Sequence, residues 1–215
     1  MSRPETDSTP QRLLEAAVAL FAEQGYRRTT VRAICDKAGA NVSAVKYHFG
    51  DKARLYDAAL DYARQRSNRT NPYVLMDANR DFYAGQTPDR RLYLFIRMLL
   101  DHMFRDGRPT ELTRLMSHEM MHPTPALDRL VEVSARRVHQ NLIRIILDLM
   151  EQPNERRARQ LALSISGLCH FHHMAQPMIE RLCPNQQYDS VSLDRLAEHI
   201  HRISLAAIRD ASVPD

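Results

Sequence analysis

Apolar side chains near the start of the chain recur every three or four residues, which is the spacing that lines one face of a helix. The first such stripe follows Thr9-Pro10, where threonine can cap a helix and proline fits its first turn. Gly25 then offers a natural end, because glycine readily adopts the left-handed conformation of a helix C-terminal cap. The pattern predicts an opening helix between these points, with an apolar face formed by Leu13, Ala17, Leu20 and Phe21.

Three shorter stripes follow within the next forty residues or so, each behind a residue that can cap a helix. Thr29 or Thr30 can cap the first, Asn41 the second and Asp51 the third, because short polar side chains accept hydrogen bonds from free backbone amides. Gly39 separates the first two helices, and two short helices joined by a glycine-containing turn form a helix-turn-helix. We therefore predict a helix-turn-helix within residues 30–49. In its second helix we expect Val42, Val45 and Phe49 to face inward.

The rest of the chain is helical in pattern, with prolines between the helices. The polar segment Ser67–Pro72 ends in proline and is interpreted as a break between two domains. We expect a disordered tail over residues 1–9, a helix-turn-helix domain of the three-helix type over 10–66 and a helical bundle over 67–215. The predicted fold class is all-α. The helices expected in the second domain are Asp89–Arg105, Thr110–Met121, Ala126–Glu151, Glu155–Leu182 and Ser192–Ala211.

The composition is that of a globular protein, with 44% hydrophobic and 26% charged residues. The polar start Met1–Gln11 does not resemble a signal peptide, and arginines keep every apolar stretch below the ~18 residues of a membrane span. Three widely spaced cysteines favour a reducing compartment. We therefore expect a cytoplasmic protein with no membrane partner. Residues 1–66 hold 11 Lys or Arg against 8 Asp or Glu, a mild bias that suits a polyanionic partner.

The second helix of the predicted helix-turn-helix has a polar outer face that could enter the major groove of DNA, where base edges are distinguishable. Lys46 could reach guanine acceptors or a phosphate, and Ala44 is small enough to permit close approach. Lys52 begins the next helix beside free amide groups, which makes it a natural phosphate clamp. The candidate DNA-binding residues are Arg28, Thr29, Thr30, Asn41, Ser43, Ala44, Lys46, Tyr47, His48 and Lys52.

The run from Leu14 to Tyr56, with its Phe21–Tyr26, Thr29–Ile34 and Tyr47-His48-Phe49 motifs, resembles the TetR-family DNA-binding domain. The stretch Gly39–Lys52 looks like the CecR-type branch of that family. Two later segments resemble the C-terminal domain of the CecR-type branch. They are Glu119 with Pro123–Asp128, and Ser166–Phe171 with Ala175-Gln176-Pro177. One departure is Lys46, which stands where many relatives carry tyrosine, or asparagine within this branch. Because it changes what the helix can read, we predict no operator sequence.

The resemblance implies a homodimeric transcriptional repressor that binds double-stranded operator DNA. It implies that the last two helices of each subunit form a four-helix interface. Helical periodicity alone fits an internal core equally well. Paired recognition helices must, however, read half-sites about 34–36 Å apart. The candidate interface residues are Leu161, Ile165, Leu168, His172, Leu196, Ile200, Ile203 and Ala207.

The resemblance also implies a small-molecule pocket in the second domain. An effector bound there would weaken operator binding, which is a coupling between two sites. The sequence does not identify this effector. The candidate lining residues, any of which could instead be ordinary core, are Phe95, Leu99, His102, Met103, Met116, Met120, Ile143, Leu147, Phe171 and Met174.

A rival interpretation starts from His118-Glu119-Met120-Met121-His122, which has the H-E-x-x-H pattern of a zinc hydrolase. On a helix both histidines would share a face, with Glu119 as general base. Against it, Pro123 follows at once, and no third ligand is evident. A milder alternative is a metal sensor that adds His170, His172 and His173. We favour a regulator that is not an enzyme and needs no cofactor. The zinc hydrolase and the metal sensor remain as alternative hypotheses.

Overall fold

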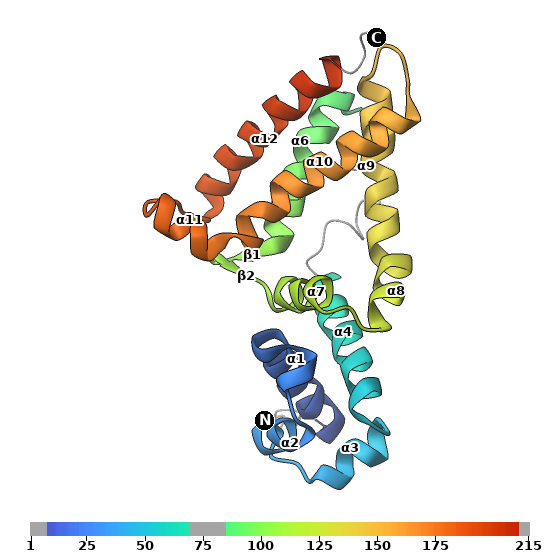
Figure 1. Ribbon diagram of the computed structural model, residues 1–215, viewed down its shortest axis with the longest axis vertical. Helices are drawn as coiled ribbons and strands as arrows, with labels where there is room; N and C mark the ends of the chain where they lie inside the picture. The colour runs from blue at the N-terminus through green and yellow to red at the C-terminus, as the bar shows by residue number, and fades with distance from the viewer. Residues whose placement is uncertain (1–7, 69–84, 211–215) are drawn as a thin grey trace, which may run out of the picture. The chain divides into compact units, whose positions relative to one another are not determined.

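The computed structural model describes residues 8–68 and 85–210 of the chain (Figure 1). Nearly all of them lie in helices, which confirms the predicted all-α class. The chain forms two compact units. The N-terminal unit consists of the described part of Met1–Thr70 together with Glu111–Leu127, and the C-terminal unit consists of the described part of Asn71–Thr110 together with Asp128–Asp215. No helix in the described part of the chain is long and apolar enough to cross a membrane.

The N-terminal unit opens with four helices: α1 (Thr9–Arg28), α2 (Val31–Ala38), α3 (Val42–His48) and α4 (Lys52–Asn68). Three predicted caps are confirmed. The hydroxyl of Thr30 accepts from the Ala33 amide at 3.1 Å, the Asn41 side chain from the Ser43 amide at 3.0 Å, and the Asp51 carboxylate from the Arg54 amide at 2.8 Å. These caps set where α2, α3 and α4 begin, as the spacing of polar and apolar residues predicts.

One local prediction about α1 is wrong, and a second, that the helix is interrupted at Gly25, holds in part. Ser8 occupies the N-cap position and Thr9 is already helical, so the described chain is ordered into α1 from Thr9 onward. At the other end, α1 continues past Gly25 to Arg28, across a kink where Gly25 has φ 74° and ψ 170°. Only glycine readily adopts that backbone conformation. Residues 1–7 of the predicted tail, and most of the predicted break at Ser67–Pro72, lie outside the described residues.

Helix α7 (Glu111–Met121) packs against both α1 and α4. It therefore belongs to the compact unit that holds the helix-turn-helix, although its sequence falls in the range predicted for the second domain. Its apolar side chains Leu112 and Leu115 are buried in this unit. The other fully buried side chains of the unit include Leu13, Phe21, Ile34, Leu55, Tyr56 and Leu60.

The C-terminal unit is a bundle in which α6 (Pro88–Met103) packs against α9 (Arg136–Leu149), α10 (Glu155–Met174) and α12 (Ser190–Asp210). Its core is formed by buried aliphatic and aromatic side chains of these four helices. The remaining elements are the short antiparallel strands β1 (Phe104–Arg105) and β2 (Arg108–Pro109), α8 (Ala126–Leu130), the π-helix η1 (Val131–Ala135) and α11 (Gln176–Leu182).

Two long predicted helices are interrupted. The first, Ala126–Glu151, contains the π-helical turn η1 between α8 and α9, which hydropathy periodicity cannot reveal. The second, Glu155–Leu182, is broken at Ala175 between α10 and α11. The break precedes Pro177, which lacks a backbone N–H and is tolerated only in the first turn of a helix. The end of the chain thus presents three helices where the sequence predicts two.

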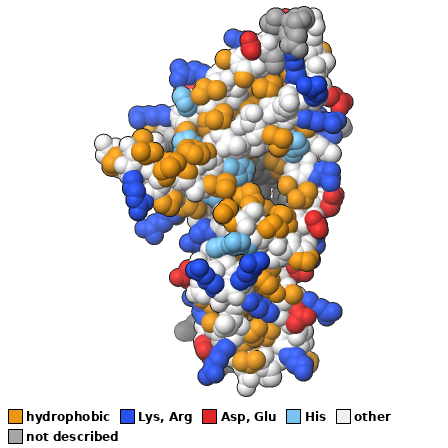
Figure 2. Space-filling model, in the orientation of Figure 1, with side chains coloured by type: hydrophobic (Ala, Val, Ile, Leu, Met, Phe, Trp, Pro, Cys, Tyr) orange, Lys and Arg blue, Asp and Glu red, His pale blue; other side chains and the backbone are white. Residues whose placement is uncertain are grey.

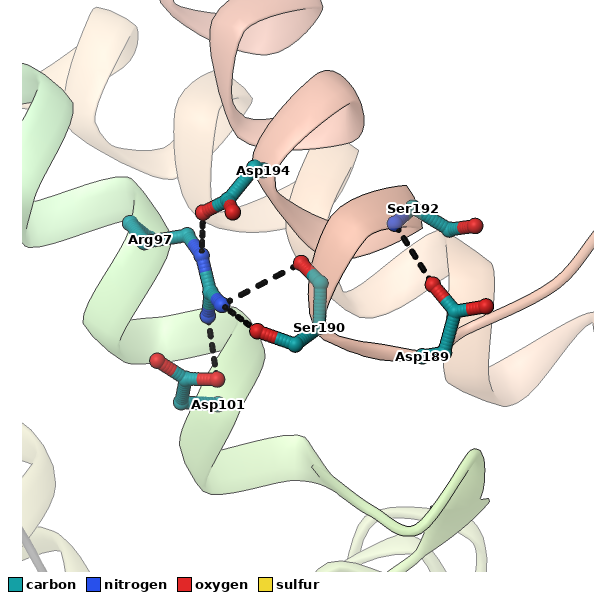
Figure 3. Close-up of polar contacts among 6 residues, drawn as sticks. All are labelled: Arg97, Asp101, Asp189, Ser190, Ser192 and Asp194. Carbon is teal, nitrogen blue, oxygen red and sulfur yellow. Dashed lines mark hydrogen bonds and ion pairs between the residues drawn. The ribbon is translucent and has the colours of Figure 1, made fainter.

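Arg97 on α6 joins that helix to the start of α12 (Figure 3). Its Nε donates to Asp194 at 2.5 Å, and one terminal nitrogen donates to the hydroxyl of Ser190 at 3.3 Å. The other terminal nitrogen pairs with Asp101, one turn further along α6. The Arg97 side chain is only 13% exposed. Two carboxylates therefore share one largely buried guanidinium, which fixes where α12 begins against α6.

The kink in α1 predicts a large difference between two glycine substitutions. A Cβ added at Gly25 would lie 2.9 Å from Nδ1 of His118 on α7, whereas nothing lies within 4 Å of one added at Gly39. Both glycines have positive φ. We expect Gly39→Ala to lower the free energy of unfolding by roughly 1–2 kcal/mol through backbone strain alone, and Gly25→Ala to cost more because His118 must also move. Chemical denaturation measures both, and equal losses would contradict the role of the α1–α7 contact.

Candidate nucleic-acid interface

Helices α2 and α3 form the predicted helix-turn-helix (Figure 1). Gly39 ends α2 in the left-handed conformation, with φ 60° and ψ 42°. The Ala40 amide then donates to the carbonyl of Cys35 at 3.0 Å, which tightens the turn. Val45 anchors α3, since its side chain is only 2% exposed. The turn is thus fixed by backbone bonds, and one apolar side chain holds the second helix.

The outer face of α3 is polar and accessible. Ser43, Lys46, Tyr47 and His48 are exposed, and the Tyr47 ring, at 85% exposed, touches little besides the ring of His48 at 4.9 Å between centroids. A large aromatic side chain held so far in solvent has no role in the core. This face can be presented to a partner without any rearrangement of the helix.

One prediction for α3 is wrong. Val42 is 50% exposed and does not face inward, because it is the first residue of a seven-residue helix that is buried only at Val45. Phe49 is partly buried, at the C-cap position. Ala44 is also partly buried, so it lies at the edge of the exposed face. The outer face accordingly carries one apolar side chain, that of Val42, beside its polar ones.

Thr29 is the clearest departure among the candidate DNA-binding residues. Its side chain is fully buried. Its hydroxyl lies within donating distance of two carbonyl oxygens, that of Gly25 at 2.9 Å and that of Leu20 at 3.2 Å. The hydroxyl closes the kinked end of α1 and is not available to DNA. Arg28, Thr30 and Asn41 remain exposed, the last two while capping α2 and α3.

Lys52 lies at the start of α4 and is held by an aromatic ring. Its ammonium nitrogen lies 4.5 Å from the centroid of the Tyr26 ring, a cation–π distance. Partial burial lowers the pKa of this ammonium. Tyr26 is a neighbour of Lys52 that the sequence argument missed, because no local spacing connects it with a lysine in another helix. Lys52 is therefore positioned beside the α4 N-terminus, where free amides favour an anion.

The H-E-x-x-H residues do not assemble a metal site. The Glu119 carboxylate is fully buried and accepts from the Tyr56 hydroxyl at 2.6 Å and from the Thr124 amide at 3.1 Å. His118 packs beside Gly25, and His122 is exposed. Within the described ranges no group of three or more His, Cys, Asp or Glu is arranged to hold a metal. The zinc-hydrolase alternative has no support in this arrangement.

The ten candidate pocket residues are divided between the two compact units. Phe95, Leu99 and Met103 are buried in the core of the C-terminal unit, whereas Met116 and Met120 lie on α7 in the N-terminal unit. His102 is partly buried, and its pKa is lowered to about 4 by burial, then by His170 and Arg105. Ile143 and Leu147 pack against the core, while Phe171 and Met174 are about half exposed.

A cavity of about 460 Å³ lies in the groove between α10 and α12, and one candidate pocket residue, Phe171, lines it. Four candidate interface residues line it: Leu168, His172, Ile200 and Ile203. Leu161, Ile165, Leu196 and Ala207 pack wholly or partly into the subunit, and Ile165 and Ile200 are each only 2% exposed. The groove continues into an apolar surface over α10, α11 and the start of α12, and hydrophobic side chains gather over these helices in Figure 2. Its exposed members include Leu163, Leu168, Phe171, Met174, Met178, Leu182 and Val191.

Comparisons with known proteins agree with this geometry. The model described as "Bacterial regulatory proteins, tetR family" matches residues 13–59, and the model described as "HTH-type transcriptional dual regulator CecR, C-terminal domain" matches residues 88–208. A capped helix-turn-helix with a polar outer face, followed by a helical C-terminal unit, defines a DNA-binding transcriptional regulator. The chain belongs to the TetR family, and its C-terminal part is of the CecR type.

Individual relatives cover part of the chain. The repressor AcnR of Corynebacterium diphtheriae is 31% identical over 134 residues, which is 60% of this chain and 67% of the relative. The dual regulator CecR of Shigella flexneri is 30% identical over 145 residues, 65% of this chain and 64% of the relative. Among solved structures, a TetR-like regulator from Rhodococcus sp. RHA1 has a TM-score of 0.64 at 19% identity, covering 95% of this chain and 99% of its own.

The buried hydroxyl of Thr29 predicts an effect on stability and none on DNA contact. Thr29→Val keeps the branched shape but removes the donor, so we expect the free energy of unfolding to fall by roughly 0.5–1.5 kcal/mol. DNA affinity per folded molecule should stay unchanged in a mobility-shift titration. Thr30→Val is the comparison variant, because it removes an exposed capping hydroxyl that is also a candidate phosphate contact, and its DNA affinity should therefore fall. A loss of affinity in Thr29→Val at full folding would place this hydroxyl at the DNA after all.

Proposed function

We propose that this regulator binds operator DNA as a homodimer, represses transcription, and is released by a small-molecule effector. The observation that carries the proposal is the exposed outer face of α3 beside Lys52, which the Tyr26 ring holds at the start of α4. That arrangement combines a base-reading surface with a phosphate contact, the two parts that a specific DNA-binding protein needs. AcnR is named a repressor and CecR a dual regulator, so repression is the simpler choice of the two. Acting on DNA, the protein would work in the cytoplasm.

In the proposed complex α3 enters the major groove. Lys46 contacts guanine acceptors or an adjacent phosphate, Tyr47 and His48 contact the backbone or a thymine methyl group, and Ser43 and Ala44 permit close approach. Val42, which is exposed, adds a second apolar group for thymine. Arg28, Thr30, Asn41 and Lys52 provide contacts to the phosphates, which position the helix without reading sequence.

We assign the second copy of the chain to the apolar surface over α10, α11 and α12. A contiguous set of half-exposed aliphatic and aromatic side chains is unusual on a monomer and marks an interaction site. The groove that holds Leu168 and Ile203 would receive side chains of the partner subunit. A two-fold symmetric pair would also supply two copies of α3, one for each half-site.

The effector site is assigned to the C-terminal unit, away from the groove that the second copy would cover. A related fold from Saccharomonospora viridis, with a TM-score of 0.64 and 19% identity over 92% of this chain and 96% of its own, was solved in complex with choline. The choline complex of that protein supports a small organic effector for this chain but does not identify it. Any effector acts only through a difference between its affinities for the two conformations of the dimer.

The test of DNA recognition is a selection of bound fragments from a random-sequence duplex pool, followed by mobility-shift titrations against the recovered duplex. The chain has three lysines, so Lys37→Ala on α2 is a matched control for Lys46→Ala and Lys52→Ala. We expect Lys46→Ala to cost about 1–3 kcal/mol and to change the preferred sequence, and Lys52→Ala to weaken all sequences alike and lower the salt slope by about 1. Binding that competitor DNA abolishes at every salt concentration would refute the proposal.

The dimer surface is tested separately by sedimentation. A glutamate in place of Phe171, which is 50% exposed on α10, should dissociate the dimer, because a charge would be buried against the partner's apolar side chains. Val133→Glu is the matched control, since Val133 on η1 is 45% exposed and outside the apolar surface. A Phe171→Glu variant that sediments as wild type would show that the copies associate elsewhere.

A further inference from the structure

Four side chains in the N-terminal unit form a continuous line of contacts that starts at Lys52. Its ammonium lies 4.5 Å from the centroid of the Tyr26 ring, and that ring lies 4.9 Å from the ring of Tyr56. The Tyr56 hydroxyl in turn donates to Glu119 at 2.6 Å. The line therefore starts at the surface of α4 and ends in a carboxylate of α7.

The deep end of this line is held firmly. Glu119 has no exposed surface, and the Thr124 amide and hydroxyl also donate to it, at 3.1 and 3.0 Å. The Tyr56 side chain is 2% exposed, and burial with the Glu119 contact raises the pKa of its phenol. The phenol is consequently a hydrogen-bond donor under all ordinary conditions. A buried donor facing a buried acceptor has no alternative partner in water, so the Tyr56 ring is fixed in place.

The aromatic part of the line is equally constrained. The Phe21 ring packs edge-on against Tyr56 at 4.7 Å and lies 6.1 Å from Tyr26. Tyr26, which is partly buried, cannot tilt away from Tyr56 without moving this cluster. The face that Tyr26 offers to Lys52 thus depends on where the hydroxyl of Tyr56 is anchored.

We propose that Glu119 and Tyr56 are positioning residues for the DNA contact made by Lys52. Glu119 holds Tyr56, Tyr56 sets the ring of Tyr26, and that ring holds the flexible lysine at the α4 N-terminus before DNA arrives. A lysine that is already ordered loses less conformational freedom when it meets a phosphate. This inference rests on the proposed phosphate contact of Lys52. It gives Glu119 a part in DNA affinity, although it lies two side chains away from the lysine.

The experiment is a double-substitution cycle with wild type, Tyr56→Phe, Lys52→Ala and the double variant. Each protein is titrated against the duplex recovered by the selection at several salt concentrations, with the folded fraction measured alongside. We expect Tyr56→Phe to weaken binding about 3- to 10-fold in the wild-type background and not at all in the Lys52→Ala background. Its salt slope should fall toward that of Lys52→Ala, which a role in folding alone would not produce.

Tyr62→Phe is the matched control, because Tyr62 is also on α4 and its hydroxyl donates to the carboxylate of Glu15 at 2.8 Å. Its effect should be the same in both backgrounds. Glu119→Gln, which keeps an acceptor for Tyr56, should retain most of the affinity that Glu119→Leu loses. Should Tyr56→Phe not fold, Tyr26→Leu tests the middle of the line in the same cycle.

The outcomes separate the inference from the function on which it rests. Equal losses for Tyr56→Phe with and without Lys52 would overturn the positioning role and leave the phosphate contact intact. A Lys52→Ala protein with wild-type affinity and salt slope would remove the phosphate contact itself, and the inference with it. If Tyr56→Phe weakens binding only in the protein that retains Lys52, and lowers the salt slope there, the result supports both the phosphate contact and the positioning role.

Discussion

A carboxylate with no access to solvent governs how the N-terminal unit is assembled. Burying a charged group is costly unless donors surround it, and the donors around Glu119 come from separate parts of the chain. Tyr56 reaches it from α4, and Thr124 reaches it from the turn that follows α7. Helix α7 can satisfy these bonds in one position only. Apolar packing would tolerate small shifts of α7 along α1 and α4, whereas short hydrogen bonds to a buried carboxylate do not.

A different, local constraint explains why α3 can make few apolar contacts. The turn between α2 and α3 is fixed by the Gly39 conformation and by caps at Thr30 and Asn41, which are local features. Local features of this kind are readable from sequence, because a capping residue and the helix it begins lie within four positions of each other. The starts of α2, α3 and α4 were predictable for that reason. Val45, the one buried side chain of α3, then anchors this helix.

What the sequence could not show are the contacts between segments far apart in the chain. Thr29 and Thr30 are adjacent and chemically identical, yet one hydroxyl is buried under the kink at Gly25 and the other caps α2 in solvent. Glu119 looks like a catalytic base within H-E-x-x-H, but its neighbours are Tyr56 and Thr124. On α10 a signal was available. Leu163, Gly167, Phe171 and Met174 follow one another at helical spacing opposite the buried stripe of Ala158, Ala162, Ile165 and Cys169. Two apolar faces on one helix indicate a second partner, although periodicity cannot say which face is internal.

The position of α7 in the chain gives the buried carboxylate a wider consequence. The match to the CecR-type C-terminal domain spans residues 88–208 and so includes α7, but α7 folds with the helix-turn-helix. The chain leaves the C-terminal unit at Thr110, contributes α7 to the N-terminal unit, and returns at Asp128. A change of conformation that pulls on either end of α7 is opposed by the bonds of Glu119. Those bonds also fix the Tyr56 ring against which Tyr26 packs, and Tyr26 in turn lies against Lys52. In the proposed complex, displacing α7 and disordering the phosphate contact of Lys52 would therefore disturb the same interactions. Coupling between two sites requires such a shared set of interactions, with a different energy in each state.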